Sequence, residues 1–141
     1  MKIVFVCTGN TCRSPLAESI AQQLMPDFDI VSRGLMAQDG QPISTHSREL
    51  LERHELPIPN AAQLFDEVDA EADLILTMTA SHCQMIQAMY GSEVNVYALN
   101  DYVNEDLAVE DPYGGCYETY EKVFDQLTRM IEKLKTKLVA E

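Results

Sequence analysis

The chain has 141 residues, of which 46% are hydrophobic and 23% are charged, and its formal net charge at pH 7 is −13. This length and balance are typical of one globular domain, so we expect a single domain over residues 1–141 with a core of its own. The strongly negative charge argues against nucleic acid or an anionic membrane as the main partner, because both repel an acidic surface.

The sequence also predicts a cellular compartment. No apolar run approaches the roughly 20 residues that a membrane-spanning helix needs. The first expected strand follows directly after Lys2, which leaves no room for a signal peptide. Two of the four cysteines lie in one short polar loop, which favours a reducing compartment over a disulfide-bonded secreted fold. We therefore expect a cytoplasmic monomer that does not associate with membranes.

The N-terminal stretch predicts a strand, a tight loop and the start of a helix. Residues 3–6 form a short, continuous apolar run, typical of a parallel strand that is covered on both faces. Ser14 followed by Pro15 indicates a helix start, with the Ser14 hydroxyl as the cap and the proline where no amide donor is lost. A loop between such elements directs backbone N–H groups toward the positive end of the helix dipole. This arrangement is an anion cradle, usually for phosphate.

The loop between strand and helix has its own chemistry. It lacks the lysine of a Walker loop and carries Cys7 at its start and Arg13 six residues later. Amides and a dipole that attract phosphate also stabilise a thiolate, so we expect Cys7 to be a nucleophile. Arg13 presents a planar, charged fork to phosphoryl oxygens. The residues expected to hold the phosphate are Thr8, Gly9, Asn10, Thr11, Cys12, Arg13 and Ser14.

Strands and helices alternate along the rest of the chain. A helix that starts at residue 14 and ends at Pro26 precedes elements expected at 29–32 (strand), 44–53 (helix), 64–70 (short helix), 74–78 (strand), 81–90 (helix), 94–99 (strand) and 120–138 (final helix). This alternation predicts an α/β fold in which a four-stranded parallel sheet has helices on both faces, with the loop at the carboxyl end of a strand.

Two segments resemble one family. Val6 to Pro15, with Ala17 and Glu18 following, resembles the signature of the low-molecular-weight protein tyrosine phosphatases, and Asp111 to Gly115 resembles that family's general-acid loop. The resemblance covers nearly the whole chain, because length, motif order and spacing all fit. It implies a Rossmann-like fold, phosphorylated protein substrates, a phosphocysteine intermediate, and neither a metal nor an organic cofactor.

Asp111 is the candidate general acid. A carboxyl group beside a bound phosphate dianion keeps its proton more readily, because two like charges resist coexisting. Pro112 restricts Asp111 to extended conformations, which helps to fix the carboxyl group on a loop. After protonating the leaving group, Asp111 would activate water in the second step. Glu110 is the competing carboxylate, and Asp106 is a more distant one.

The resemblance also implies supporting roles. The Ser32 hydroxyl would brace Asn10, whose residue type suits a left-handed turn position. The Ser14 hydroxyl would bond the Cys7 sulfur and ease its departure. Cys12 is either the partner of Cys7 in a reversible disulfide or a structural free thiol.

Substrate choice depends on the walls of the pocket. Thr11, Gly114 and Gln38 stand where apolar or aromatic residues often hold a phenyl ring, and a planar, polar phosphoguanidinium suits them better. Tyr113 is expected to form another wall. The combination of Thr11, Met78-Thr79 with His82, and the Asp111 segment resembles the protein arginine phosphatase branch of Gram-positive bacteria, in which the loop threonine is associated with selectivity.

We therefore expect a protein arginine phosphatase. The alternatives are a tyrosine phosphatase, a phosphoprotein-binding module, and a thioredoxin-coupled arsenate reductase. The last of these needs closely spaced redox cysteines, whereas Cys83 and Cys116 are 33 residues apart.

Overall fold

The computed structural model describes residues 1–139. Its four strands form one sheet in the order β2-β1-β3-β4, and all neighbouring strands are parallel. This architecture confirms the expected α/β fold. In chain order the elements are β1 (Lys2–Cys7), α1 (Arg13–Leu24), β2 (Asp29–Gly34), α2 (Thr45–Arg53), the 3₁₀ turn η1 (Asp69–Glu71), β3 (Leu74–Thr77), α3 (Ala80–Tyr90), β4 (Val96–Ala98), α4 (Leu99–Tyr102) and α5 (Tyr117–Val139).

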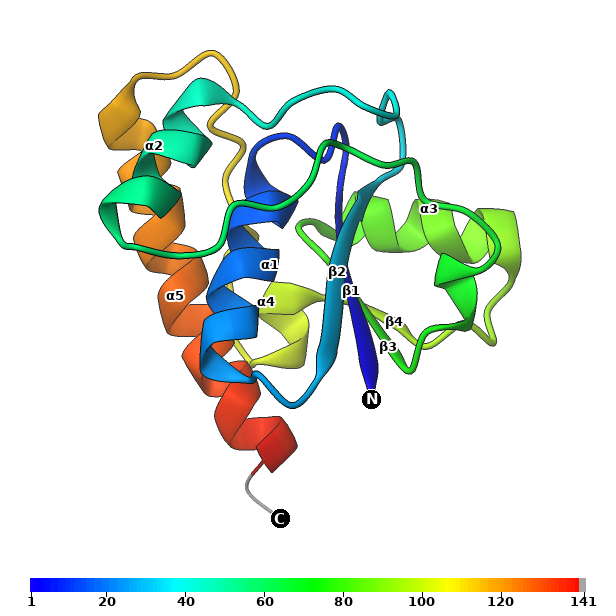
Figure 1. Cartoon of the computed structure of the whole chain (residues 1–141). Coiled ribbons are helices and arrows are strands. Elements are labelled where there is room, and N and C mark those ends of the chain that lie inside the picture. Colours follow the sequence, from blue (N-terminus) through cyan, green and yellow to red (C-terminus); the bar gives the residue numbers. More distant parts are fainter. Residues whose placement is uncertain (140–141) are drawn as a thin grey trace.

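The helices form layers on the two faces of the sheet. Figure 1 looks along the sheet from the β2 edge, with α1, α2 and α5 on one side and α3 on the other. Side chains alternate along β1, so Ile3 and Phe5 enter the larger core while Val4 and Val6 enter the smaller one under α3. Burial on both faces explains why the first strand is a continuous apolar run.

The long helix α5 supplies much of the larger core. Its apolar residues recur at helical spacing and pack with those of α1, such as Leu16 and Ile20. Each buried aliphatic side chain of this kind stabilises the fold by about 1.5–3 kcal/mol relative to an exposed one. The buried residues of α5 are Tyr120, Val123, Phe124, Leu127, Met130, Ile131 and Leu134.

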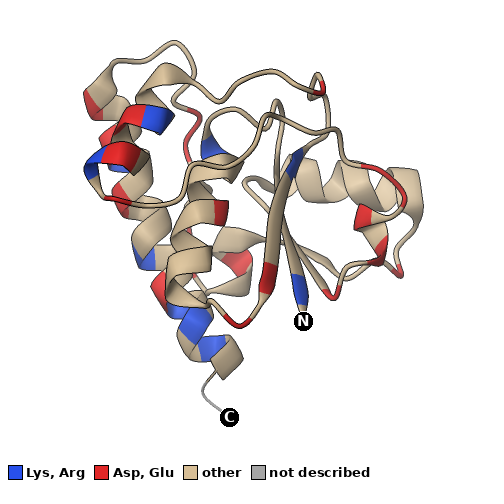
Figure 2. Cartoon of the chain, in the orientation of Figure 1, with Lys and Arg blue, Asp and Glu red and all other residues tan. Residues whose placement is uncertain are grey.

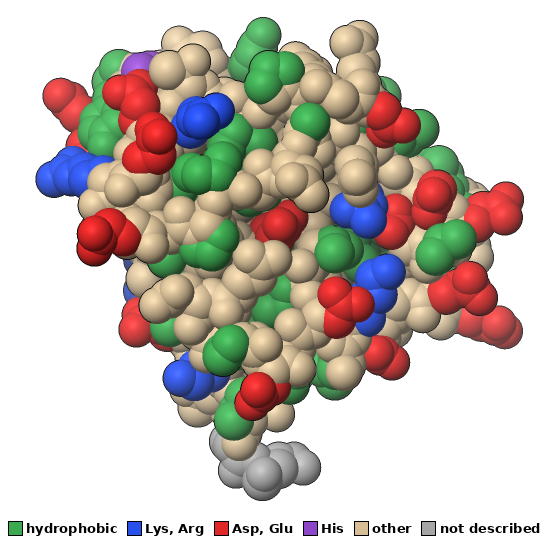
Figure 3. Space-filling model, in the orientation of Figure 1, with side chains coloured by type: hydrophobic (Ala, Val, Ile, Leu, Met, Phe, Trp, Pro, Cys, Tyr) green, Lys and Arg blue, Asp and Glu red, His purple; other side chains and the backbone are tan. Residues whose placement is uncertain are grey.

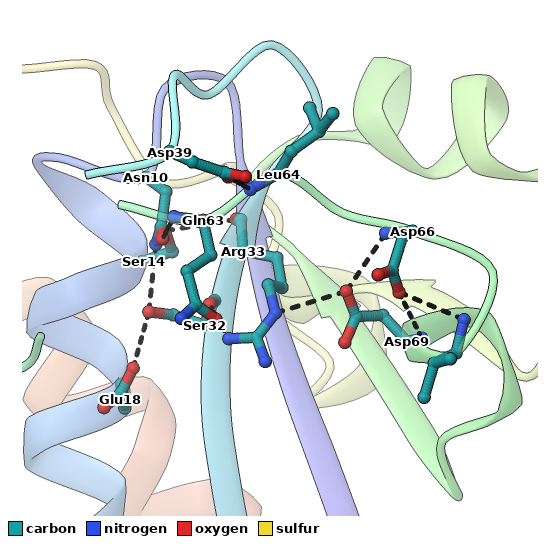
Figure 4. Close-up of polar contacts among 11 residues, drawn as sticks. Asn10, Ser14, Glu18, Ser32, Arg33, Asp39, Gln63, Leu64, Asp66 and Asp69 are labelled. Carbon is teal, nitrogen blue, oxygen red and sulfur yellow. Dashed lines mark hydrogen bonds and ion pairs between the residues drawn. The ribbon is translucent and has the colours of Figure 1, made fainter. Parts of the chain in front are cut away.

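The prediction of a helix over residues 64–70 is wrong. Leu64 instead bridges to Gly34 at the end of β2, and only residues 69–71 form a 3₁₀ turn. The Asp66 carboxylate accepts the amides of Val68 and Asp69, at 3.0 and 3.2 Å (Figure 4). A side chain that satisfies nearby amides in this way competes with helix formation.

The fourth strand is shorter than expected. We expected a strand over residues 94–99, but β4 covers only residues 96–98 and Leu99 begins α4. The amide of Val103 bonds the carbonyl of Leu99 at 3.1 Å, which turns the chain back onto the larger core.

Charge is distributed unevenly over the molecule. Figure 2 shows acidic residues on most elements and loops, whereas Lys and Arg gather along the C-terminal half of α5. The space-filling view of the same side shows the acidic residues dispersed over this face, with no single acidic patch (Figure 3). Over residues 1–139, no helix has the length and apolar character needed to cross a membrane.

Candidate active site

The candidate site lies at the carboxyl end of β1. This strand lies inside the sheet, with β2 on one side and β3 on the other. The connections to these two neighbours run in opposite directions. Open α/β sheets bind ligands at the strand ends where the direction of the connections changes in this way. A cavity of about 290 Å³ opens there. Its lining comprises Cys7, Thr8, Gly9, Thr11, Cys12, Arg13, Gln41, Asp111 and Tyr113.

Cys7 lies at the base of the cavity and is only 3% exposed. Its Sγ is 2.9 Å from Ser14 Oγ and accepts the backbone amide of Asn10 at 3.3 Å. The Cys7 sulfur therefore lies beside a hydroxyl and a backbone amide, close to the start of α1. A cysteine sulfur in such surroundings can act as a nucleophile and as a leaving group.

Ser14 does not cap α1, contrary to the expectation from the sequence. The helix begins at Arg13, and its N-cap residue, Cys12, makes no side-chain capping bond. The Ser14 hydroxyl is already engaged by Cys7 Sγ and Asn10 Nδ2. A helix start without a capping side chain leaves its first amides available to an anion.

Asn10 organises the underside of the loop (Figure 4). Its backbone is left-handed, with φ of 56°, and its Nδ2 donates to Ser14 Oγ at 2.8 Å and to Ser32 Oγ at 2.9 Å. Its Oδ1 accepts the amide of Gln63 at 2.9 Å. Ser32 Oγ in turn donates to Glu18 Oε1 at 2.6 Å, and burial raises the pKa of Glu18. These bonds link the loop to α1, to β2 and to the segment after residue 60.

Gly34 lies directly beneath the loop. It is the register partner of Cys7 in the parallel pairing of β1 with β2. A Cβ atom at this position would lie 2.7 Å from the Thr8 carbonyl oxygen and 2.8 Å from the Asn10 amide nitrogen. Backbone atoms cannot easily move away, so only glycine fits beneath the loop. The sequence alone does not indicate this role, because the contact joins residues that are distant in the chain.

Arg13 connects the phosphate loop to the Asp111 loop. The side chain is buried, and Nη1 donates to the Val109 carbonyl at 3.2 Å. Its Nη2 is 3.9 Å from Asp111 Oδ2. These contacts hold the guanidinium at the cavity, which Arg13 and Asp111 both line.

Asp111 is the carboxylate at the cavity. Its side chain is 60% exposed, and Oδ1 accepts the amide of Tyr113 at 3.0 Å. The competing carboxylates Glu110 and Asp106 line a separate cavity beside α5, together with Lys122. Of the three acids that the sequence offered, the structure therefore brings only Asp111 to Cys7.

The cavity walls differ in part from expectation. Thr11 and Tyr113 line the cavity as expected, and Tyr113 is 77% exposed. Gln38 and Gly114 are not part of the lining, and Gln41 is. No sequence signal singled out Gln41, because the course of an irregular loop depends on its tertiary contacts.

The remaining cysteines are spread over the molecule. Cys12 lines the cavity, and its Sγ is 3.5 Å from the hydroxyl of Tyr120. Burial and the contact with Cys12 raise the pKa of Tyr120 to about 12. Cys83 lies in α3 and contacts the carbonyl of Val96, while the exposed Cys116 directly precedes α5. Neither lines the cavity, so the structure does not place a further thiol there.

Cys7 lines the cavity beside the loop amides, so a nucleophilic sulfur and an anion cradle are present together. The guanidinium and the carboxyl group beside it complete the groups needed to bind and transfer a phosphoryl group. Fold and site together define the class, a phosphatase that works through cysteine.

Comparison with known proteins gives the family. Residues 2–141 match the family described as low molecular weight phosphotyrosine protein phosphatase. The low molecular weight protein-tyrosine-phosphatase PtpB of Staphylococcus epidermidis is 50% identical over 137 residues, which cover 97% of this chain and 99% of the relative. The chain therefore belongs to the low molecular weight protein tyrosine phosphatase family and is a cysteine-based protein phosphatase.

Solved structures agree with this assignment. The YwlE arginine phosphatase from Geobacillus stearothermophilus superposes with a TM-score of 0.93 at 30% identity, covering 99% of this chain and 93% of that one. A YwlE arginine phosphatase described as a C7S mutant with a phosphorylated active-site serine superposes with a TM-score of 0.91 at 31% identity. That match covers 98% of this chain and 95% of the neighbour.

Proposed function

We propose that this protein hydrolyses phosphoarginine on proteins through a phosphocysteine intermediate. The observation that carries the proposal is the composition of one cavity. The Cys7 thiol, which accepts the Asn10 amide and lies 2.9 Å from the Ser14 hydroxyl, lines the cavity together with the hydroxyl-bearing Thr11, the amide-bearing Gln41 and the Asp111 carboxyl group. Polar walls of this kind suit a planar, N–H-rich guanidinium better than a phenyl ring.

The first step transfers the phosphoryl group to sulfur. The Cys7 thiolate attacks phosphorus in line, forming the S–P bond as the N–P bond breaks. The amides from Thr8 to Ser14 and the Arg13 guanidinium hold the equatorial oxygens. Asp111 donates its proton to the leaving guanidine nitrogen, so the product leaves as an unphosphorylated arginine.

The second step releases phosphate. Asp111, now ionised, takes a proton from a water molecule as its oxygen attacks phosphorus and the S–P bond breaks. The Ser14 hydroxyl, 2.9 Å from Sγ, donates to the departing thiolate. This scheme uses backbone amides, side chains and water.

A tyrosine phosphatase is the second candidate, and a specific observation favours it. The Staphylococcus relative, 50% identical, is named a protein-tyrosine-phosphatase. The two candidates share every step and differ in the leaving group, which is a phenol oxygen in one case and a guanidine nitrogen in the other.

The deciding experiment compares two peptides that differ only in carrying phosphoarginine or phosphotyrosine. We expect the wild type to favour phosphoarginine in kcat/KM by about tenfold or more, and Thr11→Ile to reverse or abolish the preference, because a lost hydroxyl contact weakens binding of an N–H-rich group. Cys7→Ser is the negative control. A wild-type preference for phosphotyrosine would replace the proposal with the second candidate.

The covalent intermediate needs its own experiment. Rapid acid quenching during turnover should yield a phosphorylated peptide that contains Cys7, identified by mass spectrometry. A labelled peptide elsewhere, or turnover by Cys7→Ser, would contradict the scheme.

For Cys12 we infer the role of redox partner. Treatment with peroxide would oxidise Cys7 to a sulfenic acid. The Cys12 thiol would then attack the Cys7 sulfur, forming the S–S bond as the S–O bond breaks, and its proton would leave with the hydroxyl group as water. Activity after peroxide treatment should return with a thiol reductant in the wild type and return far less in Cys12→Ser. Equal recovery would leave Cys12 as a structural thiol.

A further inference from the structure

A buried histidine holds the phosphate loop from the side opposite Asn10. His82 lies in the first turn of α3 and is only 6% exposed. Its Nε2 is 2.9 Å from Thr8 Oγ1, and its Nδ1 is 3.0 Å from Thr79 Oγ1. Thr8 follows the nucleophile directly and lines the cavity. The imidazole thus joins a cavity residue to the N-cap of α3.

The contacts of Thr79 allow its hydroxyl to donate to the ring, which would place the ring proton on the other nitrogen. The hydroxyl of this N-cap residue accepts the backbone amide of His82 at 3.3 Å and is 3.2 Å from Ser81 Oγ, which can donate to its second lone pair. The Thr79 proton is then available for His82 Nδ1. With Nδ1 as acceptor, the ring proton is on Nε2 and is donated to Thr8 Oγ1.

The surroundings keep this ring neutral. Burial, and to a lesser extent the Arg13 guanidinium, lower the pKa of His82 to about 4, although Asp111 acts in the opposite direction. At neutral pH the imidazole therefore has one N–H donor and one acceptor, and both are engaged by threonine hydroxyls.

We propose that His82 is a positioning residue of the phosphate site, whose Nε2–H donates to Thr8 Oγ1 so that the Thr8 hydroxyl proton is directed to a phosphoryl oxygen. A hydroxyl whose lone pair is occupied by a fixed donor has its own proton free for another acceptor. In the cavity the acceptor is an anion, which the loop amides and Arg13 also bind. The inference depends on the proposed function at one point, because it takes that anion to be the phosphoryl group of a substrate.

The protonation state can be tested without any assay of activity. Two-dimensional ¹⁵N–¹H spectra of the imidazole side chains in the full-length protein at pH 7 should show the His82 proton on Nε2. A proton on Nδ1 would mean that Thr8 donates to the ring, and the proposal would be overturned.

The functional part is a double-mutant cycle on Thr8→Val and His82→Phe, with His82→Gln as the conservative variant that retains an N–H donor. We expect each of the first two to lower kcat/KM by about threefold to tenfold, the range of one neutral hydrogen bond. Both should weaken competitive inhibition by inorganic phosphate, and the double variant should lose no more than either single one. His82→Gln should recover part of the loss. Additive losses, or unchanged inhibition by phosphate, would refute the role.

A matched control separates positioning from folding. His54 ends α2 and stacks on Phe124 at a ring distance of 4.4 Å, outside the cavity. His54→Phe should keep wild-type kinetics and phosphate inhibition, and urea unfolding of every variant shows how much of each is folded. Assays with both phosphopeptides keep the outcome independent of substrate class, so a wrong substrate assignment would leave the cycle intact.

Discussion

The phosphate loop and the Asp111 loop face the same cavity but are held very differently. In the first, Cys7, Asn10 and Ser14 are buried and joined by hydrogen bonds of 2.8–3.3 Å. In the second, Asp111 and Tyr113 are 60% and 77% exposed, and Asp111 reaches Arg13 only at 3.9 Å.

In the proposed mechanism, this difference separates two tasks. Binding a phosphoryl group requires donors that are fixed before the substrate arrives, because reorganising them during the reaction would cost free energy. Protonating a leaving group requires a carboxyl group that can adjust to the group being released. The buried loop would therefore hold the phosphoryl group, which is the same in every substrate. The exposed loop would serve the leaving group, which varies.

The largest effect on activity should come from a substitution in the exposed Asp111 loop. Asp111→Asn should slow hydrolysis of a substrate with a basic leaving group by about 10²- to 10⁴-fold, and should slow an aryl phosphate with an acidic phenol far less. Its free energy of unfolding should stay within about 0.5 kcal/mol of wild type, because the side chain is exposed. Steady-state kinetics on both substrates and urea unfolding test this contrast. Equal losses on the two substrates would remove Asp111 from the acid role.

The rigid side should respond in both activity and stability. Gly34→Ala places a Cβ 2.7 Å from the Thr8 carbonyl, which should displace the loop, lower kcat by about tenfold to a hundredfold and cost about 1–3 kcal/mol of stability. At Gly9 a Cβ would meet only Thr11 Oγ1, at 3.6 Å, so Gly9→Ala is the matched control for unfolding. Full activity in Gly34→Ala would show that the loop is less constrained than its contacts indicate.

Acid should weaken the rigid side through His82. The unfolded chain protonates this residue near pH 6.5 and the folded protein near pH 4. Between these values the unfolded state binds more protons, so this contribution to stability is complete above pH 6.5 and declines toward pH 4, by up to about 1.4 kcal/mol per pH unit. Urea unfolding at pH 7 and 4.5 should show that wild type loses more of its free energy of unfolding at the lower pH than His82→Gln does. A constant difference would contradict the buried neutral ring.

The smallest effect should come from the exposed wall. Tyr113→Ala should raise KM by up to about tenfold, in the range of one aromatic contact, with kcat and unfolding almost unchanged. Tyr97, an exposed tyrosine that packs on Tyr102, supplies the control variant Tyr97→Ala. A fall in kcat for Tyr113→Ala would mean that the tyrosine also orients Asp111.

The sequence predicted the residues that meet through local structure. A strand, a polar loop and a helix start in succession placed Cys7 and Arg13 at one strand end, and the sheet followed from alternating periodicity. Three features escaped prediction because they depend on distant segments. Gly34 lies beneath the loop by strand register, Gln41 reaches the cavity from an irregular loop, and His82 bonds Thr8 across 74 positions. The predictions of a helix over residues 64–70 and of a Ser14 cap were wrong. Asp66 bonds the amide of Val68 and Ser14 bonds the sulfur of Cys7 instead.

The bond from Arg13 to the Val109 carbonyl spans 96 positions in the chain. During synthesis on the ribosome, β1 and its loop are made well before the Val109 carbonyl group that orients the guanidinium. A nascent chain therefore carries the Cys7 thiol long before it carries the carbonyl group that orients the Arg13 guanidinium.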